Sequence, residues 1–155
     1  MTQPIQDSDH VVRYCSKTKL APGGDRATGA AFQLHPGSAR RPPDTYLSVY
    51  WLEFLGGKGR NEQLGRLRTF IEKSPYKDTR LGAEGRLAVL NVGRTIAEIS
   101  PRLGGTGLAI RHEPRGEDPK DPHSGIHGYG FNEVGEEIAA HLAEIASEQL
   151  YPTKI

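Results

Sequence analysis

Residues 46–73 have the sequence YLSVYWLEFLGGKGRNEQLGRLRTFIEK, which combines two different periodicities of apolar side chains. Apolar and polar residues alternate at its start, with Leu47, Val49 and Trp51 on one face, and this pattern predicts a β-strand. In 61–73 the apolar residues recur at spacings of three and four, as they do in an amphipathic helix. A strand that leads directly into a helix indicates a domain that mixes both elements.

The rest of the chain continues this mixture. Val134, Ile138, Leu142, Ile145 and Leu150 form one apolar stripe that predicts a C-terminal amphipathic helix, ended by Pro152, with Leu142 and Ile145 facing the core. We expect further strands at 9–15, 30–34, 86–92, 108–112 and around Ile126, and a short helix at 93–100. This order predicts an α+β fold, with a small mixed sheet of about five or six short strands and two or three helices.

The length of 155 residues predicts a single domain over 1–155, with flexible ends at roughly 1–8 and 152–155. Cys15 is the only cysteine, which excludes an intramolecular disulfide and a zinc site built from several cysteines. Residues 1–10 lack the apolar run of a secretory signal, and no stretch approaches the roughly 18 apolar residues of a membrane span. We therefore expect a cytoplasmic protein that does not enter a membrane.

The charge is nearly balanced overall but unevenly distributed. A net charge of +1 argues against a dedicated nucleic-acid binder, so nucleic acid or a nucleotide has only weak support as a partner. Residues 58–86 carry eight basic and four acidic side chains, whereas 133–148 carry five glutamates and no lysine or arginine. Both segments fit solvated helix faces, and the first also fits a basic docking face.

Histidines supply the catalytic candidates. His112 ends a predicted strand, and His123 lies in the Pro-rich loop that leads to the next one. Because sequential strands are usually neighbours, we expect the two rings to come within reach, with Asp121 orienting one of them and His10 joining if the first strand pairs nearby. A polar surface loop whose histidines cap turns is the alternative.

Asp121 and three further residues are ligand-binding candidates. Arg13 offers a planar fork of donors for a phosphate or carboxylate, Tyr14 offers a ring for stacking, and Glu53 follows a strand end. On an ideal strand Arg13 points away from His10, so a twist or bulge would be needed to bring them together. An edge strand with one charged face is the alternative for this segment.

No cofactor or metal is expected. His123 and His127 would lie about 13 Å apart on a strand, too far to share an ion, and the Gly and Pro residues around them oppose a helix. The Gly-rich segment 104–107 lacks the lysine and the following helix of a phosphate-binding loop. The chain also contains no G-x-S-x-G and no H-E-x-x-H motif.

Four blocks of sequence carry a resemblance: DSDHVVRYC at 7–15, YLSVYWLEFL at 46–55, LNVG at 90–93 and DPHSGIHG at 121–128. Together they resemble a group of small uncharacterised bacterial cytosolic proteins that share DxDHVxRY, LSVxWLE and DPHSGI-like blocks. The resemblance spans most of the chain and implies a bacterial, cytosolic, single-domain protein. It brings no activity with it.

Two functional hypotheses follow. The first is a small binding or accessory domain that acts with a protein partner, with bacterial conflict or defence as one setting. The alternative is a small His-dependent enzyme that acts on a phosphate or nucleotide substrate, as a phosphodiesterase or as an ADP-ribosyltransferase-like domain. By analogy of strand order and residue type, Arg13, Ser48 and a glutamate would then contact NAD. Convergence of His10, Arg13, His112 and His123 in one cleft would favour the enzyme, and scatter would favour the binding domain.

Overall fold

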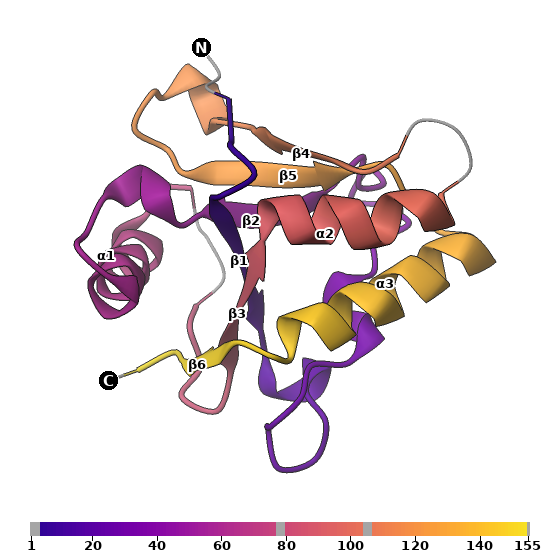
Figure 1. The fold of residues 1–155 in the computed structure, drawn as a ribbon, viewed down its shortest axis with the longest axis horizontal. Coiled ribbons are helices and arrows are strands. Elements are labelled where there is room, and N and C mark those ends of the chain that lie inside the picture. Colours follow the sequence, from indigo (N-terminus) through magenta and orange to yellow (C-terminus); the bar gives the residue numbers. More distant parts are fainter. Residues whose placement is uncertain (1–3, 77–79, 104–106, 155) are drawn as a thin grey trace.

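A single antiparallel sheet organises the fold (Figure 1). The computed structural model describes residues 4–76, 80–103 and 107–154, and the statements below concern those residues. The sheet has the order β4-β5-β2-β1-β3-β6. Its strands are β1 (His10–Cys15), β2 (Leu47–Trp51), β3 (Arg86–Asn91), β4 (Ala109–His112), β5 (His123–His127) and β6 (Leu150–Pro152).

Helices cover both faces of the sheet. They are α1 (Arg60–Lys73), α2 (Val92–Ile99) and α3 (Glu133–Ala146). In Figure 1, α2 and α3 lie side by side on one face and α1 lies on the other, and a separate hydrophobic core fills each interface. Leu142 and Ile145 are buried on the α3 side, as the apolar stripe predicts. The predicted α+β class and C-terminal helix are therefore confirmed.

Two predicted elements are wrong, and both errors arise from tertiary contacts. Residues Gly29–Phe32 form a 3₁₀ turn instead of a strand, because Phe32 is buried in the core shared with α3 rather than paired in the sheet. Helix α3 ends at Ala146, and Leu150 continues instead as a strand paired with Ala88. The sheet is also antiparallel in every pairing, where a mixed sheet was expected.

The C-terminal end of the described chain is attached to the sheet. Pro152 pairs with Arg86, and Thr153 is fully buried with its hydroxyl donating to the backbone oxygen of Gly82. No helix in the described ranges is long and apolar enough to cross a lipid bilayer.

The part of the sheet that concerns function is β1-β2-β5. Residues Val12, Leu87 and Val89 are buried beneath α1, but Tyr50 is only half-buried and Ser48 is exposed on the same face. The register places Tyr50 opposite His123 and Ser48 opposite Gly125. The accessible residues in this part of the face are Ser48 and Tyr50 on β2, whereas β5 is buried from His123 to Ile126 and half-buried at His127.

Candidate functional site

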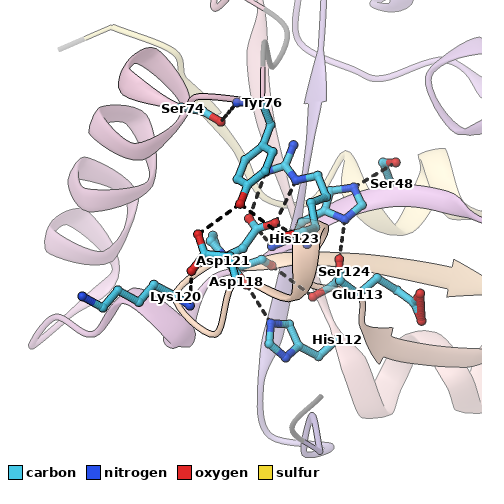
Figure 2. Close-up of polar contacts among 12 residues, drawn as sticks. Ser48, Ser74, Tyr76, His112, Glu113, Asp118, Lys120, Asp121, His123 and Ser124 are labelled. Carbon is cyan, nitrogen blue, oxygen red and sulfur yellow. Dashed lines mark hydrogen bonds and ion pairs between the residues drawn. The ribbon is translucent and has the colours of Figure 1, made fainter. Parts of the chain in front are cut away.

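The site centres on a contact between Ser48 on β2 and His123 on β5 (Figure 2). The ring nitrogen Nδ1 of His123 donates to the backbone oxygen of Glu113 at 2.8 Å, because a carbonyl oxygen only accepts. In the neutral ring the other nitrogen, Nε2, then carries the lone pair, and it lies 3.2 Å from the Ser48 hydroxyl oxygen. The arrangement therefore holds an imidazole as a proton acceptor toward an exposed hydroxyl.

A buried ion pair shapes the loop that holds His123. Asp121 is fully buried, and its carboxylate accepts hydrogen bonds from Arg115 Nε at 2.8 Å, Arg115 Nη2 at 2.9 Å and Arg115 N at 2.8 Å. It also accepts from the backbone N–H of His123 at 3.1 Å. Burial by itself raises the pKa of Asp121, but these hydrogen bonds outweigh it and lower the pKa below its usual value. The carboxylate is therefore held as an anion that fixes residues 113–122.

Tyrosine rings flank His123 on the sheet. The centroid of the Tyr46 ring lies 6.0 Å from that of His123, and the centroid of the Tyr50 ring lies 6.3 Å from it, both edge-on. Gly125 makes this possible, because a Cβ at that position would lie 2.3 Å from the Tyr46 ring. Aromatic faces next to a proton acceptor suit a substrate that contains a planar ring.

Arg13 reaches the backbone of the same serine from the neighbouring strand, but its side chain lies on the other face of the sheet, with Val11 and Cys15. Strands β1 and β2 pair at Val11–Trp51 and Val12–Tyr50, and at the next position the Arg13 guanidinium donates through Nη1 to the backbone oxygen of Ser48 at 2.9 Å. Its Nε donates to the backbone oxygen of Ala31 at 2.9 Å. Burial lowers the pKa of Arg13, and the guanidinium forms no ion pair with any residue that the structure describes.

The predicted convergence of His112 and His123 is wrong. His112 pairs with Ser124, so it shares the face of Ser124, and the adjacent His123 points to the opposite face. His112 is buried against Trp51 and Phe54, at centroid distances of 5.4 and 4.9 Å. Its Nε2 donates to the backbone oxygen of Asp121 at 2.7 Å, so His112 anchors the far end of the loop (Figure 2).

The other sequence candidates lie in separate places. His10 and Glu53 contact each other, with 2.6 Å between His10 Nδ1 and Glu53 Oε2 and 2.7 Å between the His10 backbone nitrogen and Glu53 Oε1. This pair attaches the 3₁₀ turn Glu53–Leu55 to β1. The Tyr14 hydroxyl accepts from the backbone N–H of Gly82 at 3.0 Å. Of the candidates, His123 contacts the Ser48 hydroxyl, and Arg13 contacts the Ser48 backbone oxygen from the opposite face of the sheet.

Sequence reasoning missed Arg115 and Tyr76. The Tyr76 ring lies 4.4 Å from the centre of the Arg115 guanidinium, and its hydroxyl donates to the backbone oxygen of Arg115 and to Asp118, each at 3.1 Å. Tyr76 therefore connects the segment after α1 to the loop that holds His123. Opposite charges at positions 115 and 121 of a Pro-rich loop were the available signal for the ion pair.

The described residues do not favour a metal site or a reactive thiolate. No three His, Cys, Asp or Glu side chains among them gather as metal ligands do. Cys15 is buried, and burial raises the pKa of its thiol to about 11, which keeps the thiol protonated at neutral pH.

His127 extends the site along β5. Its ring lies 4.8 Å from that of Tyr46, and its Nε2 lies 3.5 Å from Glu113 Oε1, too far for a good hydrogen bond. Burial lowers the pKa of His127, as does Arg111, and Glu113 opposes them in part. The folded protein therefore favours neutral His127.

This pKa direction predicts a loss of stability in acid. Because the folded pKa lies below the unfolded value of about 6.5, the contribution of neutral His127 is present above that pH and is lost as the pH falls below it. Urea midpoints between pH 5 and 8 should therefore fall less on acidification in His127→Gln than in the unmodified protein. Equal slopes in both proteins would contradict the assignment.

No protein-family model matches the chain, and no curated protein and no solved structure is significantly similar to it. The function proposed below therefore depends on the geometry of the site.

Proposed function

We propose that this domain is a small His-dependent enzyme that acts on a nucleotide substrate, of ADP-ribosyltransferase-like type with NAD as the substrate. One observation carries the proposal: Nε2 of His123 lies 3.2 Å from the exposed hydroxyl of Ser48, while Nδ1 donates to Glu113 O, so Nε2 is the accepting nitrogen when the ring is neutral. A ring oriented in this way accepts a proton from a bound hydroxyl or water.

Arg13 supports a substrate that carries a phosphate. The guanidinium of Arg13 donates hydrogen bonds to the neutral carbonyls of Ala31 and Ser48, and the Asp44 carboxylate attracts it without forming an ion pair. Its Nη2 forms no hydrogen bond with those residues. A phosphate group bound on the Arg13 face of the sheet would add a second negative charge beside the guanidinium.

The three residues come from adjacent strands, as the ADP-ribosyltransferase analogy expects, but their side chains do not share one face. Arg13 lies on the face of Val11 and Cys15, and Ser48 and His123 lie on the face of Val12 and Tyr50. Arg13, Ser48 and His123 lie on β1, β2 and β5, which are neighbours in the sheet. The analogy also expects a glutamate beside Ser48. Among the described residues, Glu53 is paired with His10 instead, and the Glu113 carboxylate faces His127. In this proposal His123 takes the place of that acidic residue.

The proposed chemistry needs a base more than an acid. Nicotinamide is a cation within NAD and leaves as a neutral molecule, so its departure requires no proton. The bond between the ribose carbon and the nicotinamide nitrogen breaks, and a bond from that carbon to an acceptor oxygen forms. The proton of the acceptor passes to His123 Nε2, the nitrogen that carries the lone pair when the ring is neutral.

The proposal is tested with NAD and with water as the acceptor. We expect the purified protein to bind NAD and to release nicotinamide, measured by calorimetry and by chromatography. Ser48→Ala should reduce the rate at least about tenfold, because it removes the group that aligns the base. Ser38→Ala, an exposed serine in another loop, is the matched control and should leave the rate unchanged. A folded protein that neither binds NAD nor releases nicotinamide would contradict the proposal.

A partner-binding accessory domain is the second candidate. Two observations favour it: His10, Arg13, His112 and His123 do not gather in one cleft, and the chain exposes an apolar patch away from Ser48.

A further inference from the structure

The start of α3 exposes two large apolar side chains. Phe131 is 47% exposed and Val134 is 45% exposed, and they are the exposed large hydrophobic residues of the described chain. They lie three residues apart, on a surface formed by the N-terminal end of α3 and the segment 33–36. We call this surface the α3 patch. Clustered exposed apolar side chains are typical of interaction sites, whereas scattered ones are not.

The backbone holds Phe131 in place. The Asn132 side chain caps α3 by accepting from the backbone N–H of Gly135 at 2.8 Å, and the backbone N–H of Glu136 donates to Asn132 O at 3.0 Å. Gly135 allows the preceding turn to pack closely, because a Cβ there would lie 1.9 Å from Gly130 O. A side chain presented on an ordered backbone costs little entropy to bind.

A small cavity lies beside Phe131. Its volume is about 180 Å³, and it is lined by Gln33, Leu34, Pro36, Gly130, Phe131, Gly135 and Glu136. Small-molecule sites usually measure roughly 300–1,000 Å³. The cavity therefore suits one apolar side chain of a partner better than a cofactor or a substrate.

The charge around the cavity is negative. Glu133, Glu136 and Glu137 are exposed, and none of them forms an ion pair within the described ranges. Negative residues stabilise a helix N-terminus, which accounts for the glutamates but not for the apolar side chains between them. An acidic rim around an apolar centre is complementary to a basic segment with an apolar residue.

A second copy of the chain is a poor occupant. The basic segment 58–86 includes α1, which packs on the face of the sheet opposite α3. Contact between α3 of one copy and α1 of the next would use two different surfaces, so it would not close into a two-fold dimer. The charge pattern therefore points to a different protein.

We propose that the α3 patch is a docking surface for a basic protein segment that places one apolar side chain in the cavity beside Phe131. The contact is small, so it forms a transient rather than an obligate complex. It is independent of Ser48 and His123, and it holds whether or not the domain is an enzyme.

The test uses two synthetic amphipathic peptides, one of leucine and lysine and one of leucine and glutamate. Each is titrated into the ¹⁵N-labelled full chain, and shifted amide signals locate the binding surface. We expect the lysine peptide to shift signals around Leu34, Phe131 and Val134. The glutamate peptide should have no effect, because the rim repels it.

Substitutions separate the apolar contribution to peptide binding from the electrostatic contribution. Phe131→Ser with Val134→Ser should weaken binding of the lysine peptide at least about tenfold, and thermal melts check that the double variant is folded. The double variant Glu133→Lys with Glu136→Lys should bind the glutamate peptide more tightly than the lysine peptide, which reverses the preference of the unmodified protein. Glu144→Lys, at an exposed residue at the other end of α3, is the control for a change of charge away from the α3 patch and should leave binding unchanged.

Three results would overturn the proposal. They are shifts that map elsewhere on the protein, equal binding of both peptides, and a loss of binding in Glu144→Lys as large as that in the Glu133 and Glu136 variant.

Discussion

Replacing Asp121 with alanine is expected to lower the free energy of unfolding by about 3–5 kcal/mol, the usual cost of breaking a buried ion pair from one side. Asp121 is fully buried, whereas the side chain of Arg115 is 22% exposed. The substitution leaves the Arg115 guanidinium facing an apolar gap and removes the acceptor of the His123 backbone N–H. Urea unfolding monitored by circular dichroism measures the difference.

Glu98→Ala is the matched control. Glu98 also pairs with an arginine, Arg94, at 3.0 Å, but both side chains are more than 40% exposed. Surface pairs contribute about 0–1 kcal/mol, so the control should be nearly neutral. A similar small effect in Asp121→Ala would show that the loop does not depend on the buried pair.

Acid should remove the contribution of Asp121. The folded pKa lies below the unfolded value of about 3.9, so the stabilisation is fully present above that pH and is lost as the pH falls through the folded pKa. The difference in stability between the unmodified protein and Asp121→Ala should therefore shrink below about pH 4. A difference that stays constant in acid would indicate that packing, rather than the charge, stabilises the loop.

Local patterns were sufficient to predict most of the secondary structure. The alternation in 46–51 predicted which face of β2 is buried, and Leu47, Val49 and Trp51 are buried as expected. The spacing of apolar residues likewise predicted α1 and the body of α3. In each case the side-chain period follows directly from the geometry of the element.

The errors came from contacts between residues distant in sequence. Nothing near Leu150 in the sequence shows that it pairs with Ala88, so the apolar stripe was extended one turn too far. His112 and His123 were predicted to lie together because their strands were expected to be adjacent. The strands β4 and β5 are indeed neighbours in the sheet. Pairing of His112 with Ser124, however, turns the two rings to opposite faces.

The candidate site was predicted only in part. Arg13 and Ser48 were named together through an analogy, and His123 was named as a base, but the contact of both with Ser48 depends on the order β1-β2-β5. Arg115 was missed because its role depends on burial of Asp121, which the charged, Pro-rich loop does not reveal.

His123→Ala is expected to reduce nicotinamide release by about 10²–10⁴-fold, the usual contribution of a general base. The substitution removes the imidazole whose Nε2 faces the Ser48 hydroxyl. Added imidazole should restore part of the rate, because it can occupy the space left by the side chain. Rescue separates a chemical role from a structural one, because free imidazole cannot repair a misfolded loop. Rates and thermal melts with and without imidazole measure both effects.

His112→Ala is the contrasting variant. His112 is buried between Trp51 and Phe54 and donates to Asp121 O, so its loss should lower stability, and imidazole should not restore activity. His141→Ala, at a half-buried position on α3 away from Ser48, should leave the rate unchanged. If the rate is unchanged in a folded His123→Ala protein, His123 is not the base. The enzyme proposal then fails, and the partner-binding hypothesis remains, because the α3 patch does not depend on His123.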